Sequence, residues 1–199
     1  RVIIFSDEQR RMLCSMGVAE ERIVVIPNGV DEIVYCPGPS DFKKQIGADV
    51  LVTFLGRLDP EKGVGVLCET FQQIDPPPSV KLVVVGTGLD ADSLRRRFGW
   101  DERIVFTEGL SLAMLEAMAC GVATVATDVG SDGEALRGAG IVLDPDSLPA
   151  QLRLALETLL TYPDFRRSLG HLARQRVEER YSLAGNIERL IHLYKTMLV

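Results

Sequence analysis

Apolar positions fall in short runs that alternate with helical patterns along most of the chain. Runs rich in Val, Ile and Leu predict strands at residues 1–5, 23–26, 51–55, 81–85, 103–106, 123–126 and 140–143. Apolar positions three and four apart predict helices at residues 7–16, 63–74, 90–98 and 112–119. Several strands are apolar on both faces, which is typical of parallel strands covered by helices. The pattern therefore predicts an α/β fold with an open, doubly wound, Rossmann-like parallel sheet.

The pattern changes near both ends of the chain. After Pro145 only helical segments follow, near residues 147–161, 163–180 and 182–198. Near the start, Pro27-Asn28-Gly29-Val30-Asp31 interrupts the pattern with turn chemistry, because Asn and Gly tolerate positive φ. We therefore predict three parts. Residues 1–26 end a preceding domain or lead into the main one, residues 27–180 form the main domain, and residues 181–199 form a C-terminal helix.

Composition narrows the class of protein. The 199 residues carry a formal net charge of −6, so we expect no nucleic-acid partner, since binding to phosphate backbones needs positive charge. No secretory signal is predicted, because the apolar run from Arg1 to Phe5 is too short. No transmembrane segment is predicted, because the most apolar stretch is interrupted by Glu116, Gly121 and Asp128. His171 and His192 are interpreted as surface or helix-packing residues. The cysteines form no CxxC pair and are interpreted as reduced core thiols of a cytosolic protein: Cys14, Cys36, Cys68 and Cys120.

The first candidate site is the loop that follows the predicted strand at residues 51–55. It reads Gly56-Arg57-Leu58-Asp59-Pro60-Glu61-Lys62-Gly63 and leads into a helix. Ligands of doubly wound sheets bind after the carboxyl ends of the strands, and a helix N-terminus favours anions. Arg57 offers a planar fork of donors and Lys62 a point charge, a combination suited to a diphosphate. The alternative is a solvated loop with surface pairs between Arg57 and Asp59 or between Lys62 and Glu61.

Other short motifs favour structural roles. Gly86-Thr87-Gly88 follows the next predicted strand but lacks the full GxGxxG spacing, so a tight strand-to-helix turn is the preferred interpretation. Asp90-Ala91-Asp92 and Asp144-Pro145-Asp146 have DxD spacing, which elsewhere binds manganese. Here a helix N-cap and a turn are favoured, and no metal site is predicted.

The second candidate site runs from Glu108 to Glu116. Gly109 and Ser111 are typical of a helix start, with Glu108 just outside it. Glu116 then falls inside the helix among apolar or small neighbours. Burying an isolated carboxylate is costly, so Glu116 is predicted to have a strong polar partner. A sugar diol is one candidate for this partner, and a backbone amide or an arginine is the other.

Taken together, these segments resemble glycosyltransferase family 4, whose members have the two-domain GT-B architecture. The resemblance runs nearly end to end. It rests on the Pro27 to Asp31 turn as the start of the C-terminal domain and on the loop with Arg57 and Lys62. It also rests on the paired glutamates, and on Glu116-Ala117-Met118-Ala119-Cys120-Gly121 with the strand that follows.

The resemblance implies a retaining, metal-independent transferase that needs no cofactor and uses a nucleoside-diphosphate sugar as donor. Glu108, Arg57 and Lys62 would be catalytic, with the two cations stabilising the leaving diphosphate. Glu116 would bind the ribose, and Gly56 and Gly86 would line the donor site. The backbone amides that would meet phosphate are those of Gly109, Leu110 and Ser111. The acceptor, a carbohydrate or a lipid-linked molecule, would bind mainly to an N-terminal domain absent from this chain. The protein would be cytoplasmic, with peripheral membrane association open.

The sequence departs from the family at one point. In the family, roughly twenty residues with a further helix and strand separate the strand ending near Phe106 from the glutamate motif, a long connection by ordinary standards. Here Thr107 is followed directly by Glu108. We therefore predict that a segment is missing between residues 107 and 108, a true deletion being the other possibility. A non-catalytic nucleotide-binding module and a GT-B-fold nucleotide-sugar epimerase remain alternative functions.

Overall fold

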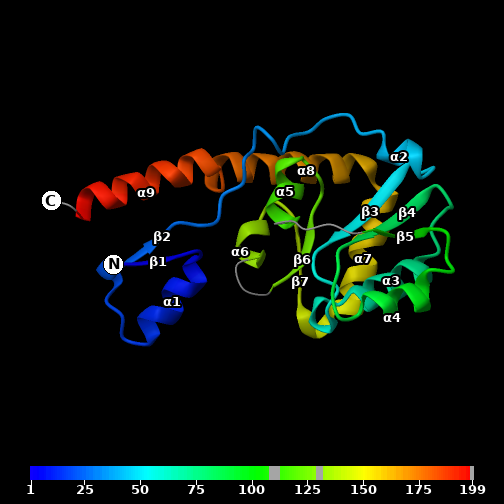
Figure 1. The fold of residues 1–199 in the computed structure, drawn as a ribbon, viewed down its shortest axis with the longest axis horizontal. Coiled ribbons are helices and arrows are strands. Elements are labelled where there is room, and N and C mark those ends of the chain that lie inside the picture. The colour runs from blue at the N-terminus through cyan, green and yellow to red at the C-terminus, as the bar shows by residue number, and fades with distance from the viewer. Residues whose placement is uncertain (108–112, 129–131, 198–199) are drawn as a thin grey trace. The chain divides into compact units, whose positions relative to one another are not determined.

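The computed structural model describes residues 1–107, 113–128 and 132–197 (Figure 1). Its strands are β1 (Val2–Ile4), β2 (Ile23–Val25), β3 (Val50–Leu55), β4 (Val80–Val85), β5 (Ile104–Thr107), β6 (Val125–Thr127) and β7 (Ile141–Leu143). Its α-helices are α1 (Asp7–Ser15), α2 (Phe42–Gln45), α3 (Val64–Ile74), α4 (Ala91–Phe98), α5 (Ala113–Ala119), α6 (Asp132–Leu136), α7 (Leu148–Thr161), α8 (Pro163–Arg180) and α9 (Leu183–Met197). Short 3-10 turns occur at Glu20–Arg22, Pro60–Lys62 and Pro145–Ser147. Each predicted strand and helix is present, whereas α2 and α6 were not predicted.

The chain divides into two compact units. Unit 1 comprises Arg1–Pro37, Met114–Asp146 and Asp164–Val199, and unit 2 comprises Gly38–Ala113 and Ser147–Pro163. The described strands pair as β1-β2 and β6-β7 in unit 1 and as β3-β4-β5 in unit 2. Each of these pairings is parallel, as an α/β fold built from β–α–β connections requires.

The sheet of unit 2 brings its strand ends to one edge. The register places Leu55 opposite Val85 and Val85 opposite Thr107, so β3, β4 and β5 end level with one another. Figure 1 shows α3, α4 and α7 alongside this sheet. The loops that follow the strands therefore leave from a single edge, where the ligands of such sheets bind.

Apolar packing holds unit 2 together. The central strand β4 is almost completely buried, with Leu82, Val83 and Val84 at most 2% exposed, as its uninterrupted apolar run predicts. Helices α3 and α4 supply the other half of the core. The buried members of this core are Leu58, Val64, Cys68, Phe71, Val80, Leu82, Val84, Leu94, Phe98 and Ile104.

Two cysteines contradict the prediction of core thiols. Cys68 is buried as predicted, and burial raises the pKa of its thiol to about 12. Cys120 is half-buried, but Cys14 and Cys36 are exposed. The apolar period of α1 explains the error for Cys14, because in the structure this helix buries none of its residues. All four thiols are free.

Unit 1 fixes the segment from Pro27 to Asp31 against the junction between α8 and α9. The Val30 amide donates to the Tyr181 carbonyl at 2.9 Å, and the Asn186 side-chain amide donates to the Pro27 carbonyl at 2.7 Å. A Cβ at Gly29 would lie 2.8 Å from the Leu183 Cα, so only glycine allows this approach. The predicted turn is not present at residues 27–31: Val30 forms an isolated parallel bridge with Ser182, and distant helices anchor the segment.

One polar network lies on the side of unit 2 away from the loops that follow β3, β4 and β5. The Asp101 carboxylate accepts hydrogen bonds from Arg103 Nε and Nη2, each at 3.0 Å, and from Gln72 Nε2 at 3.2 Å. Arg103 Nη1 also donates to Asp75 Oδ1 at 2.7 Å, just after α3. The hydrogen bonds from Arg103 lower the pKa of Asp101 to about 2. The network therefore ties the end of α3 to the start of β5.

We expect Asp101→Asn to reduce the free energy of unfolding at pH 7 by about 2 kcal/mol, because a lowered carboxyl pKa is a gain in folded-state stability. The sign follows from the direction of the shift. The wild-type contribution is complete above the unfolded pKa of about 3.9 and is lost as the pH falls toward about 2. Urea denaturation between pH 2 and pH 7 measures both effects. Asp41→Asn, which removes an exposed pair with Lys44, should cost less than about 1 kcal/mol; equal losses would contradict the prediction.

Candidate functional site

The loop after β3 is fastened to the loop after β4. The Gly56 amide donates to the Val85 carbonyl at 3.1 Å, and the Leu58 amide donates to the Thr87 carbonyl at 2.9 Å. Leu58 is fully buried and belongs to the apolar core of unit 2. The loop that carries Arg57 therefore starts from a fixed backbone, although its charged side chains reach solvent.

Gly86 is required by the close approach of these two loops. Its φ is +149°, in the region that favours glycine, and a Cβ there would lie 1.9 Å from the Gly56 carbonyl oxygen. Its amide donates to the Thr107 carbonyl at 3.0 Å. The tight turn predicted at Gly86 is present. The predicted role of Gly56 and Gly86 in lining a donor site stays a prediction.

Arg57 projects from this loop between two carboxylates. Its Nη1 lies 3.0 Å from Asp59 Oδ2, and its Nη2 lies 3.2 Å from Glu61 Oε1. The Arg57 side chain is 68% exposed, so its guanidinium is held in place but open to solvent. The surface pair with Asp59, which the sequence offered as the alternative interpretation, is therefore present. It leaves the arginine accessible to an anionic ligand.

The burial of Asp59 was not predicted from the sequence. It is only 9% exposed, and its Oδ1 accepts a hydrogen bond from the Leu89 amide at 3.1 Å while Oδ2 pairs with Arg57. One carboxylate thus joins the loop after β4 to the guanidinium on the loop after β3. A carboxylate directly after the core residue Leu58 was the available signal, since such a residue is buried and needs partners.

Lys62 and the start of α3 complete this surface. Lys62 is exposed and ends the 3-10 turn at Pro60–Lys62. Gly63 follows with a φ of +66°, and no side chain caps the first turn of α3. A helix start without a side-chain cap has amide groups available for an anion. The structure thus brings Arg57, Lys62 and the start of α3 onto one loop, as the sequence predicts.

Glu116 has a polar partner that the sequence did not identify. It lies half-buried on α5, and the Tyr35 hydroxyl forms a hydrogen bond with its carboxylate. This bond, followed by repulsion from the Glu116 charge, raises the pKa of Tyr35. The partner that we predicted inside the protein was a backbone amide or an arginine, and it is instead a tyrosine. The proposed contact of Glu116 with a sugar diol stays a prediction.

Arg174 on α8 connects the two segments that carry Tyr35 and Glu116. Its Nη1 donates to three carbonyl oxygens, those of Glu32 at 2.9 Å, Tyr35 at 2.8 Å and Ala119 at 2.8 Å. It thereby joins the segment that carries Tyr35 to the end of the helix that carries Glu116. No sequence motif marks Arg174, because its partners are backbone atoms far away along the chain.

We expect Glu116→Gln to lower the pKa of Tyr35 toward the ordinary tyrosine value of about 10, because the carboxylate that favours the protonated phenol is removed. The bond to Glu116 contributes fully to stability at pH values below the pKa of tyrosine in the unfolded chain. This contribution is lost as the pH rises through the higher pKa of Tyr35 in the folded protein. Phenolate absorbance measures the titration, and subtracting the curve of Tyr35→Phe isolates this residue. Glu188→Gln, on the exposed surface of α9, should leave it unchanged. An unaltered titration in Glu116→Gln would show that the pair does not form.

The remaining candidate residues are placed as follows. Glu108, Gly109, Leu110 and Ser111 lie outside the described residues, as does residue 108 of the predicted chain break. Asp90 occupies the N-cap position of α4 without a side-chain capping bond, and Asp144 accepts from the Asp146 amide at 3.0 Å in a turn. Within the described ranges, no group of three or more His, Cys, Asp or Glu side chains is placed to hold a metal ion.

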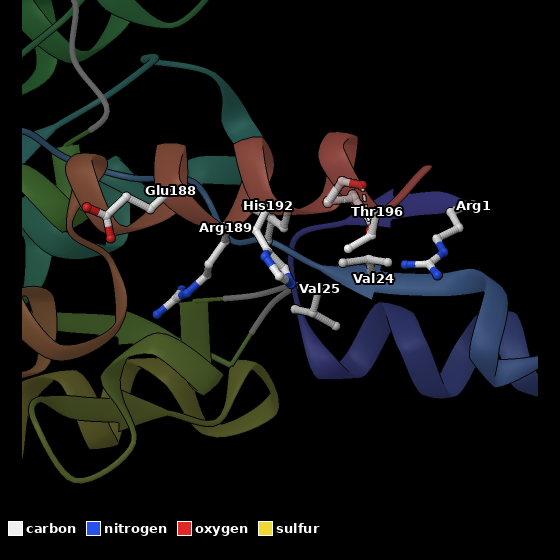
Figure 2. Close-up of a pocket in the computed structure, with 9 residues that line it drawn as sticks. Arg1, Val24, Val25, Glu188, Arg189, His192 and Thr196 are labelled. Carbon is white, nitrogen blue, oxygen red and sulfur yellow. Dashed lines mark hydrogen bonds between the residues drawn. The ribbon is translucent and has the colours of Figure 1, made fainter. Parts of the chain in front are cut away.

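Unit 1 contains a cavity of about 520 Å³, and Figure 2 shows residues that line it. Val24 and Val25 of β2 line it together with residues of α9, among them Arg189 and the exposed His192. None of the predicted site residues that the structure describes lines this cavity. It lies between a strand and the helix that covers it, whereas nucleotide sites lie beyond the strand ends.

Similarity to known proteins agrees with this arrangement. Residues 103–162 match the family described as Glycosyl transferases group 1. The chain is 27% identical to the alpha-maltose-1-phosphate synthase of Mycolicibacterium smegmatis, over 88% of this chain and 57% of that protein. It is 28% identical to the D-inositol 3-phosphate glycosyltransferase of Rhodococcus erythropolis, over 98% of this chain and 53% of that protein. The chain thus spans little more than half the length of these relatives.

Solved structures share the fold. HepE of Anabaena in complex with UDP superposes with a TM-score of 0.83 at 20% identity, covering 98% of this chain and 63% of HepE. The sucrose-phosphate synthase of Thermosynechococcus elongatus superposes with a TM-score of 0.82 at 20% identity, covering 99% of this chain and 58% of that protein. The predicted Rossmann-like α/β fold is therefore confirmed. No helix in the described part of the chain combines the length and apolarity needed to cross a membrane.

Proposed function

We propose that the chain is a group 1 glycosyl transferase, and that it is the nucleotide-sugar-binding half of a two-domain enzyme. The whole enzyme transfers a sugar from a nucleoside-diphosphate sugar to a hydroxyl group of a carbohydrate or lipid-linked acceptor. An N-terminal domain, outside this chain, binds most of the acceptor. The share of the relatives that the chain spans, 57% and 53% in the two named above, supports this division.

The cationic loop after β3 is the observation that carries the proposal. Arg57 and Lys62 lie at the strand edge where ligands of such sheets bind, on a backbone that the loop after β4 holds in place. We propose that they bind the diphosphate and stabilise the negative charge that it gains as the sugar leaves. Two side-chain cations and a helix start supply positive charge to the leaving group, so we propose that transfer is independent of a metal ion.

We propose UDP as the nucleotide. Structures of HepE, which has the same fold, are complexes with UDP and with UDP-glucose. In this chain Glu116 would accept hydrogen bonds from the ribose hydroxyls, and Tyr35 would set the orientation of its carboxylate. A carboxylate is a strong acceptor for a diol, since bonds to charged groups are about twice as strong as neutral ones.

The catalytic assignment within the glutamate motif rests on the family resemblance. We propose that Glu108 faces the transferred sugar and stabilises positive charge at its reacting carbon. The amides of Gly109, Leu110 and Ser111 would meet the phosphates at the start of α5. The product would keep the configuration of the donor at that carbon.

We also propose that an internal segment is missing before Glu108. The alignment with the R. erythropolis transferase extends over 236 residues, more than the 199 of this chain, so that relative contains residues with no counterpart here. The described strands form separate sheets, with β3-β4-β5 in one unit and β6-β7 in the other. A further β–α element between Thr107 and Glu108 would extend the doubly wound sheet past β5 and complete the glutamate motif.

Calorimetric titration of the full-length protein tests the proposal. We expect UDP and UDP-glucose to bind more tightly than ADP or GDP, uridine to bind weakly, and EDTA to leave these affinities unchanged. Absence of nucleoside-diphosphate binding would refute the proposed function, and binding that needs a divalent metal would refute metal independence. Nuclear magnetic resonance of the glycoside product reports the configuration, and inversion would refute the retaining assignment.

A further inference from the structure

Two cysteines of unit 1 lie on segments that the fold brings together. Cys36 is exposed and follows Tyr35, whereas Cys120 is half-buried and directly follows α5. The two positions are far apart along the chain, so no spacing motif marks them as a pair. Neither cysteine is among the residues assigned above to the nucleotide site.

The residues on both sides of the two cysteines are in contact. On one side, the Tyr35 and Ala119 carbonyls each accept a hydrogen bond of 2.8 Å from the same nitrogen atom, Nη1 of Arg174. On the other side, a Cβ at Gly121 would lie 3.3 Å from Pro37 Cγ. The two backbones therefore lie close together both before and after the cysteines. A disulfide needs its two Cα atoms within about 7 Å of each other, which this arrangement favours.

The charges of the two thiols also reach each other. Burial, followed by repulsion from the Cys36 charge, raises the pKa of the Cys120 thiol. The hydrogen bond to Glu116 is the largest cause of the raised pKa of Tyr35, and the Cys120 charge is a further cause. Both effects of charge require proximity, because charges that lie far apart are screened. The sulfur of Cys120 is therefore close to the segment that carries Tyr35 and Cys36.

We propose that Cys36 and Cys120 form a reversible disulfide by exchange with a low-molecular-weight disulfide such as oxidised glutathione. The Cys36 thiolate attacks one sulfur of the reagent, whose S–S bond breaks and releases one thiolate. The Cys120 thiolate then attacks Cys36 Sγ in the mixed disulfide, which forms the internal S–S bond and releases the second thiolate. The two cysteines lose two electrons and two protons, and the reagent is reduced to two thiols.

The order of the two attacks follows from exposure. Cys36 can be reached by a reagent in solution, as redox-sensitive cysteines are. Cys120 is half-buried and its raised pKa leaves less of the reactive thiolate, so it suits the second step, in which its target is already beside it. The product joins the segment after Tyr35 to the end of α5. This modification site goes beyond the proposed function and does not depend on it.

Thiol mapping of the full-length protein tests the proposal. The reduced protein is incubated with oxidised glutathione at pH 7.5, free thiols are blocked with N-ethylmaleimide, and tryptic peptides are identified by mass spectrometry. We expect a disulfide between the peptides that contain Cys36 and Cys120, and dithiothreitol should reverse it. Cys120→Ser should instead accumulate glutathione on Cys36, because the second thiol is removed. In Cys36→Ser, Cys120 should react about tenfold more slowly than Cys36 does, because it is half-buried with a raised pKa.

Two controls make the result specific. Cys14→Ser removes a cysteine that is also exposed, on α1, and should leave the yield of the link between Cys36 and Cys120 unchanged. In urea the yield should fall by about fivefold or more, because unfolding separates segments that are distant along the chain. The proposal is overturned if glutathione stays on Cys36 of the wild type without a link, if neither cysteine of the pair reacts, or if the link forms equally well in urea. UDP binding enters none of these measurements, so failure of the proposed function would leave them unaffected.

Discussion

Replacing Arg57 with alanine is expected to weaken UDP binding by roughly 1.5–3 kcal/mol, the range for hydrogen bonds to charged groups. The guanidinium is already oriented by Asp59 and Glu61, so little side-chain entropy is lost when the diphosphate binds. Lys62→Ala should have an effect in the same range, because Lys62 meets the diphosphate as a point charge. Uridine, which lacks phosphates, should lose almost no affinity in either variant. Titration calorimetry with the two ligands separates these effects.

Two further variants make the result specific. Arg153→Ala removes an exposed arginine of unit 2 that pairs with Glu157, and it should not change UDP affinity. Glu61→Gln removes one of the two carboxylates that hold Arg57, and it should leave affinity unchanged or raise it, because a competing acceptor is lost. Equal losses for UDP and uridine in Arg57→Ala would place this residue outside the diphosphate site. A loss in Arg153→Ala as large as in Arg57→Ala would indicate a general effect of charge.

The fold could be predicted because its signals are local. The uninterrupted apolar run at β4 indicates a strand buried on both faces, and the structure contains that strand. The loop with Arg57 and Lys62 was predicted on the same basis, since its place after a strand and before a helix is read directly from the sequence. The short helix α6 was not predicted from the sequence.

The supporting residues could not be predicted, because their partners are distant along the chain. Tyr35 reaches Glu116, and Arg174 reaches the Tyr35 and Ala119 carbonyls. Neither contact has a periodic or spacing signal. The exposed Cys14 shows the reverse error, in which a helical apolar period was present but the helix buried none of its residues. Sequence patterns thus predicted the loop that carries Arg57 and Lys62 better than they identified the side chains that support it.

The close approach of the two loops predicts the largest change in stability. Gly86→Ala should lower the free energy of unfolding by about 3–5 kcal/mol. A Cβ at this position would overlap the Gly56 carbonyl oxygen, at 1.9 Å, and the φ of +149° is unfavourable for any L-residue with a side chain. Both loops are held by core strands and by the buried Leu58, so neither can move away without breaking their mutual hydrogen bonds. The loss is a large part of the 5–15 kcal/mol that stabilises a typical domain.

Gly65→Ala provides the matched comparison. Gly65 lies in α3, where an added Cβ would lie 3.9 Å from Leu94 Cδ2, an ordinary contact, and the helix favours alanine over glycine. We therefore expect Gly65→Ala to raise the free energy of unfolding by about 0.4–1 kcal/mol. Urea denaturation followed by circular dichroism measures both variants. If Gly86→Ala accumulates as unfolded protein, a soluble and stabilised Gly65→Ala shows that an added methyl group is tolerated in the same unit. A wild-type midpoint for Gly86→Ala would mean that the loops after β3 and β4 are not in contact, and Arg57 would then lack the rigid support on which the proposed diphosphate site depends.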